Sequence, residues 1–164
     1  MNKTLLTIAI LGLLTLFSSA YYTDPADGRI GYKAPMLMLG NIDNNNNDLS
    51  PLKQHQGENI LLSFWSSVDA GSRLENMRYD RLSRLDGMHF VHVSVNMDRS
   101  VNVFNSIVAL DGLDRSAHYC ASSDAQEAII KSWRLDEGYH TFLIDASGEI
   151  TAVDPDEQML RSVR

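Results

Sequence analysis

The chain has 164 residues, which is enough for one ordinary domain with its own core and too few for two. Hydrophobic residues make up 44% and charged residues 21%, a composition typical of a globular protein. Asp and Glu outnumber Lys and Arg by 21 to 14, which argues against an electrostatic grip on nucleic acid or anionic lipid. The single cysteine, Cys120, excludes an internal disulfide and a four-cysteine zinc site.

Residues 1–20 have the pattern of a signal peptide. Lys3 precedes the mostly apolar run 5–17, and small residues at 18–20 offer a cleavage site. The run is shorter than the roughly 20 residues that a spanning helix needs, so we expect cleavage and no stable membrane span, with an uncleaved anchor as the alternative. The chain is therefore expected to be exported to the periplasm or cell envelope of a bacterium, where disulfides can form.

The segment after the signal is expected to be mostly irregular. Residues 21–30 read as a linker, and residues 34–39 as a short strand. The asparagine-rich tract 41–48 is typical of a surface loop, because Asn and Asp hydrogen-bond to their own backbone. Asp43 and Asp48 could offer oxygen ligands to calcium, but the acidic spacing and central glycine of an EF-hand are missing.

An almost continuous apolar run at 60–65 predicts a central strand that is buried on both faces. Helical spacing follows, with an apolar side that comprises Leu74, Met77, Leu82 and Leu85, and Gly87 marks its end. The later predicted elements are a strand at 90–95, a helix at 101–110 and a strand at 119–121. A Ser123–Gln126 capping box then opens a further helix, with Ala128, Ile129 and Trp133 inward. The chain continues with a hairpin of strands 141–145 and 149–153 and a last helix from 154. This order predicts an α/β domain whose mixed sheet is covered on both faces.

Four phrases carry a family resemblance: Gly-Tyr-Lys-Ala-Pro at 31–35, Leu-Leu-Ser-Phe-Trp at 61–65, Val-Ser-Val-Asn at 93–96, and Thr-Phe-Leu-Ile-Asp at 141–145 with Gly-Glu-Ile at 148–150. In this order they resemble the thioredoxin fold, and more closely the exported TlpA/ResA-type thiol–disulfide oxidoreductases. The resemblance covers about residues 31–153. It implies a thioredoxin-like domain at 31–164, with a central mixed β-sheet flanked by helices.

The resemblance also shows where this chain departs from the family. The family's two active-site cysteines fall at the positions of Asp69 and Ser72, and its cis-proline falls at Tyr139. Thiol–disulfide exchange needs a thiolate that attacks and a second thiol that resolves, so dithiol cycling at this turn is excluded. We expect Asp69 to cap the following helix, with a ligand-binding or acid–base role as the alternative. At Tyr139 we expect a trans peptide, and a ring that either fills the groove or presents a binding surface.

Cys120 is the only possible redox atom. His118 would point to the same face of a strand, so a Cys–His pair is geometrically possible, although a buried structural cysteine is the usual case. His89 and His92 would face opposite sides of their strand, and His55 and His140 stand apart, so we expect no metal site unless the fold assembles one. Nucleotide-binding glycine patterns are missing from the sequence, so no cofactor is expected. The nucleophile elbow of serine hydrolases is missing as well.

Three functional hypotheses follow. The leading one is a redox-inactive binding or scaffold domain that holds a polypeptide or another envelope component, in an oligomeric state that the sequence leaves open. The second is an atypical thiol oxidoreductase or peroxide-reducing enzyme that uses an accessible, low-pKa Cys120. The third is a new enzyme that uses Asp69 with Tyr139 or His140, which requires an open pocket between the turn 64–69 and the loop 138–141.

Overall fold

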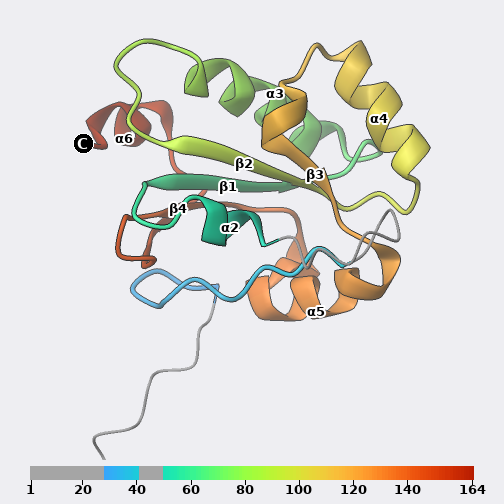
Figure 1. The fold of residues 1–164 in the computed structure, drawn as a ribbon, viewed down its shortest axis with the longest axis horizontal. Coiled ribbons are helices and arrows are strands. Elements are labelled where there is room, and N and C mark those ends of the chain that lie inside the picture. The colour runs from blue at the N-terminus through green and yellow to red at the C-terminus, as the bar shows by residue number, and fades with distance from the viewer. Residues whose placement is uncertain (1–27, 41–49) are drawn as a thin grey trace, which may run out of the picture.

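The structure is a computed structural model that describes residues 28–40 and 50–164. The predicted signal peptide, most of the predicted linker and the asparagine-rich tract lie outside the described residues. A five-stranded sheet in the order β3-β2-β1-β4-β5 lies between helices on both faces, with α3 and α4 on one side and α5 on the other (Figure 1). The predicted α/β class with a mixed, doubly covered sheet is confirmed.

The first three strands are parallel, and the last two form an antiparallel hairpin beside the first. The strands are β1 (Ile60–Trp65), β2 (Val91–Asn96), β3 (His118–Cys120), β4 (Thr141–Ile144) and β5 (Ile150–Val153). The helices are α2 (Pro51–Gln54), α3 (Ala70–Ser83), α4 (Val101–Leu110), α5 (Ser123–Trp133) and α6 (Glu157–Ser162). All of these except the four-residue α2 were predicted to within a few residues. Among the described residues, no helix combines the length and the apolarity that crossing a bilayer requires.

The α5 face of the sheet carries an apolar core. Phe64 of β1 packs against Trp133 of α5 and Phe142 of β4, with ring centroids 5.5 and 6.0 Å away. Leu37 and Leu39 from the N-terminal segment are also fully buried in this core. Side chains of this size bury large apolar areas and stabilise the α5 face mainly through the hydrophobic effect.

The predicted strand at 34–39 was wrong. Lys33 forms an isolated bridge with Glu149 at the edge of β5, and the segment then leaves the sheet and runs beside α5 (Figure 1). It is extended and alternates buried Leu37 and Leu39 with more exposed methionines, which is why its pattern resembles a strand. Pro35 also lacks the N–H that a ladder requires.

The apolar side predicted for α3 is correct for the buried Leu82 and for Met77, which packs against the core, but wrong for Leu74 and Leu85. Leu74 and Leu85 are 65% and 48% exposed, whereas the polar residues Asn76 and Asp80 are 1% and 2% exposed and face the sheet. The reason is that β1 and β2 present polar side chains to this helix, so the helix buries hydrogen-bonding groups opposite them.

At the start of α5 the capping box was misplaced. The N-cap is Ser122, not Ser123, and it makes no side-chain cap hydrogen bond. Gln126 instead donates to the backbone oxygens of Asp98 and Ala121 at 3.3 and 3.4 Å. Ala128, predicted to point inward, is exposed, whereas Ile129 and Trp133 are buried as predicted.

Candidate functional site

The turn between β1 and α3 holds the two positions to which the resemblance assigns the family's cysteines. Asp69 is the N-cap of α3, and its Oδ1 accepts a hydrogen bond from the backbone N–H of Ser72 at 2.7 Å. The Ser72 hydroxyl donates back to the Asp69 carbonyl at 3.3 Å. The hydrogen bonds from Ser72 lower the pKa of Asp69, so the carboxylate stays ionised and caps its own helix. The predicted placement at the opening of the first long helix is confirmed.

Asp98 is a site residue that sequence reasoning missed. It follows β2 and accepts hydrogen bonds from the Ser66 hydroxyl at 2.6 Å and from the Ser67 N–H at 3.0 Å. Burial raises the pKa of Asp98, but the hydrogen bonds from Ser66, Ser67 and Asn96 outweigh it and leave the pKa lowered. An ionised carboxylate therefore holds the turn that leads to Asp69. The available signal was its position just after a parallel strand beside β1.

Tyr139 lies beside this turn on the loop that precedes β4. No cis peptide occurs among the described residues, so the bond before Tyr139 is trans, as expected. The ring is half-buried and packs against the apolar core of the α5 face. Burial is the main cause that raises the pKa of the Tyr139 phenol; a hydrogen bond with Ser66 lowers it, and the carboxylates of Asp98 and Asp69 raise it further. Tyr139 thus both fills space and keeps part of its ring at the surface.

A cavity of about 500 Å³ opens between α3 and this loop. Its walls include Ser72, Glu75 and Arg78 of α3, the loop 137–141, and residues 154–156 after β5. Tyr139 and His140 line it, but Asp69 does not. The third hypothesis required an open pocket between the turn 64–69 and the loop 138–141. This cavity lies against α3 instead, with Phe64 as its single lining residue from that turn, and the carboxylate that the hypothesis assigned to catalysis is bonded into the cap of α3.

Cys120 does not have the surroundings of a reactive thiol. It is 4% exposed, and its sulfur donates weakly to oxygens of Asn96, Asp98 and Ala121 at 3.7 to 3.9 Å. Burial raises the pKa of the thiol to about 11, and the Asp98 carboxylate adds to the effect. Both ring nitrogens of His118 are engaged elsewhere, by Asn76 and by the Asp114 carbonyl. His118 and Cys120 lie on the same face of β3, as predicted, but they do not interact as a Cys–His pair.

The buried face of α3 brings together three groups that the sequence left apart. Ligand atoms of Asp80, His92 and His118 lie within 4.8 Å of one another, and all three residues are buried. Metal ligation is the obvious possibility, since neutral imidazoles and carboxylates are common ligands. However, Asp80 is already ion-paired to Arg84 and accepts from the Asp114 N–H. The Arg84 guanidinium therefore already supplies the positive charge that a metal ion would bring to Asp80.

The hydrogen bonds around this cluster instead form an ordered network centred on Asn76. Its Oδ1 accepts from the hydroxyls of Ser63 and Ser94 at 3.1 and 2.7 Å, and its Nδ2 donates to His118 Nε2 at 3.1 Å. Because the Ser63 proton goes to Asn76, His92 Nε2 must carry the proton in its 2.9 Å contact with Ser63 Oγ. His92 Nδ1 then has a bare lone pair with no partner among the described residues.

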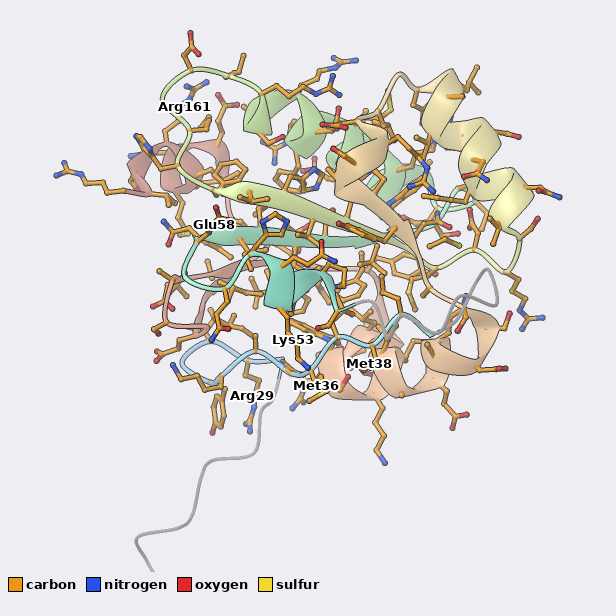
Figure 2. The ribbon with its side chains drawn as sticks, in the orientation of Figure 1. Arg29, Met36, Met38, Lys53, Glu58 and Arg161 are labelled. Atoms are coloured by element: carbon orange, nitrogen blue, oxygen red, sulfur yellow. The ribbon has the colours of Figure 1, made fainter. Side chains whose placement is uncertain are left out.

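A second cavity, of about 570 Å³, lies at the opposite end of β1. It is bounded by residues 34–37, α2 and the β4–β5 turn. Met36, Lys53 and Glu58, labelled in Figure 2, are among its lining residues. It contains none of the three positions at which this chain departs from the family, Asp69, Ser72 and Tyr139.

Comparisons with known proteins agree with this architecture. No family model matches the sequence, and no curated protein matches it significantly. Solved structures do: a thioredoxin-like protein from Parabacteroides distasonis is 24% identical with a TM-score of 0.66, covering 81% of this chain and 92% of that one.

Two further solved structures with a similar fold are named as oxidoreductases. The thioredoxin domain of a thiol–disulfide oxidoreductase from Bacteroides vulgatus is 20% identical with a TM-score of 0.64, over 81% of this chain and 93% of that chain. A secreted disulfide oxidoreductase of Mycobacterium tuberculosis is 16% identical with a TM-score of 0.52, over 64% and 75%. The chain therefore has the thioredoxin-like fold that its sequence resemblance predicted.

Proposed function

We propose that this chain is an exported binding protein derived from thiol–disulfide oxidoreductases, without dithiol redox activity, and that it docks a polypeptide beside the start of α3. The observation that carries the proposal is the N-cap of α3: the carboxylate of Asp69 bonds to the Ser72 N–H at the place where the resemblance puts the two reactive sulfurs. The helix N-terminus that would stabilise a thiolate stabilises this carboxylate instead.

The surface around the turn supports docking. Val68 and Leu74, on either side of the first turn of α3, are 92% and 65% exposed. The half-buried Tyr139 and the cavity lie next to the same helix. Exposed aliphatic side chains around a partly exposed aromatic ring are typical of protein-binding surfaces.

Export and domain organisation belong to the same proposal. Residues 1–20 would be the signal, residues 21–30 the linker, and 31–164 the thioredoxin-like domain. The secreted M. tuberculosis protein with the same fold supports an envelope location, and the signal-like pattern of residues 1–20 agrees with it.

The alternative of a single-cysteine oxidoreductase or peroxide-reducing enzyme needs an accessible thiol of low pKa. The burial of Cys120 and its raised pKa, about 11, favour the binding protein over this alternative.

The proposal is tested by two measurements on the purified chain. The first is reduction of insulin by dithiothreitol: we expect no acceleration by the protein, and an acceleration that disappears in Cys120→Ser would establish the alternative. The second is anisotropy of fluorescent extended peptides: we expect binding that Tyr139→Ala weakens. If no peptide binds, the docking function is refuted.

A further inference from the structure

We infer that the cavity between α3 and the loop 137–141 selects polypeptide segments that carry lysine or arginine. The inference deepens the proposed docking function, on which it rests, by naming the chemistry of the partner. It stands on the charges of the cavity wall, on how those charges are already engaged, and on the apolar surface beside them.

The wall is strongly unbalanced in charge. Four carboxylates line it, from Glu75, Glu137, Asp154 and Asp156, against one guanidinium, that of Arg78. The second cavity, at the other end of β1, shows no such excess, since Lys53 lines it together with Glu58 and Asp145. A low-dielectric wall that carries one sign of charge raises the local concentration of oppositely charged groups.

The only arginine of this wall is already engaged. The Arg78 guanidinium donates to Glu75 Oε2 at 2.7 Å and stacks on the Tyr79 ring at 4.7 Å from its centroid. It therefore neutralises Glu75 and leaves the carboxylates on the opposite side without a guanidinium.

On that opposite side the charges are held in place by the fold. Asp154 accepts from the Thr141 N–H at 2.8 Å and pairs with His140 Nδ1 at 2.7 Å, while Asp156 caps α6 by accepting from the Met159 N–H at 2.8 Å. Because backbone groups position both carboxylates, they form a fixed negative wall. Glu137, at the rim, is exposed and has the freedom to pair with an incoming cation.

The size and lining of the cavity favour a side chain over a bare ion. About 500 Å³ is room for more than a hydrated cation, and the half-buried Tyr139 ring contributes apolar surface. Lysine and arginine combine an apolar stem with a charged head, so they match a wall that is apolar at one side and acidic at the other. Val68 and Leu74 do not line the cavity, but they are exposed on either side of the first turn of α3, whose Gly71 and Ser72 line it, and they supply contact for the rest of the segment.

The test uses three capped fluorescent peptides of the same Gly, Ser and Leu framework, which carry paired lysines, paired glutamines or paired glutamates. The proteins are the wild type, Glu137→Lys at the rim, and Glu127→Lys on the exposed side of α5 as a control with the same change in net charge. We expect the lysine peptide to bind most tightly, and Glu137→Lys to weaken it about three- to tenfold while Glu127→Lys changes it less than about twofold.

The outcomes separate the two levels of the proposal. If all three peptides bind equally and Tyr139→Ala weakens them, docking stands and the basic preference is overturned. Equal losses in Glu137→Lys and Glu127→Lys would also overturn it, because attraction to the net negative chain would then explain the binding. If none of the peptides binds, docking itself fails, and the inference with it.

Discussion

On one face of the sheet, Phe64, Phe142 and Trp133 pack ring against ring beneath α5. On the other, Asn76 and Asp80 of α3 meet polar side chains from β1, β2 and β3. Both faces are buried, but different interactions stabilise them. The burial of apolar surface stabilises the first face and tolerates small shifts of its side chains. Hydrogen bonds stabilise the second face, and they require every partner to be present. The helix capped by Asp69 thus lies on the face whose stability is more sensitive to the loss of a single side chain. Its position depends on side chains far from the turn.

The largest expected effect is on the apolar face. Trp133→Ala should destabilise the protein by about 3–5 kcal/mol, because the ring is fully buried between Phe64 and Phe142. Equilibrium urea unfolding followed by circular dichroism measures it. Trp133→Phe should cost less, since the indole N–H that it removes has no hydrogen-bond partner among the described residues. Equal costs for the two variants would contradict a core held by apolar area.

On the polar face, Asn76→Leu should cost about 2–4 kcal/mol although it adds apolar surface, because it removes the acceptor of the Ser63 and Ser94 hydroxyls and the donor to His118 Nε2. The same unfolding measurement applies. The matched control is Asn105→Leu on the exposed side of α4, which should stay within about 0.5 kcal/mol. A neutral or stabilising Asn76→Leu would show that the network does not hold α3.

The two buried imidazoles predict acid sensitivity. Burial lowers the pKa of His92 to about 3 and that of His118 to about 4, and the nearby Arg84 charge adds to both shifts. The ordinary histidine pKa is near 6.5, so below that pH the unfolded chain takes up protons that the folded chain does not. Stability is therefore complete above pH 6.5 and declines as the pH falls toward 4.

Between pH 6.5 and 5 the loss should reach about 2 kcal/mol for each imidazole, measured as the free energy of unfolding at several pH values. His92→Gln should flatten the decline by about half, whereas His89→Gln, at an exposed position, should leave it unchanged. A decline that begins only below pH 4 would point to the carboxylates instead, since Asp98 and Asp114 have lowered pKa values.

The contrast between the faces also explains what the sequence could predict. The run at 60–65 and the helix at 101–110 were predicted correctly because β1 is buried along its whole length and α4 buries Phe104 and Val108 at helical spacing. The polar part of the inward face of α3 was missed, because apolar periodicity assigns Asn76 and Asp80 to solvent. Only their partners in the fold explain their burial: Ser63, Ser94 and His118 bond to Asn76, and Arg84 and the Asp114 N–H bond to Asp80.

The residues of the candidate site also differ in whether the local sequence could predict them. Asp69 could be placed as a helix cap, because its position after an apolar strand and before a helix is a local signal. Asp98 and the cavity beside His140 could not, since they depend on which strand ends and loops the fold brings together. The approach of His92 to His118 likewise follows from the pairing of β2 with β3, which lies outside any local pattern.

The most direct test of the central claim is to restore the missing sulfurs. In the insulin assay, the wild type should leave the rate of reduction by dithiothreitol unchanged, while Asp69→Cys/Ser72→Cys should accelerate it, because the N-terminus of α3 would then stabilise an attacking thiolate beside a resolving thiol. The single variant Ser72→Cys, which lacks the attacking thiol, serves as the control and should stay inactive. Acceleration by the wild type, or an inactive double variant that is folded, would contradict a thioredoxin-like site in which Asp69 and Ser72 replace the two cysteines.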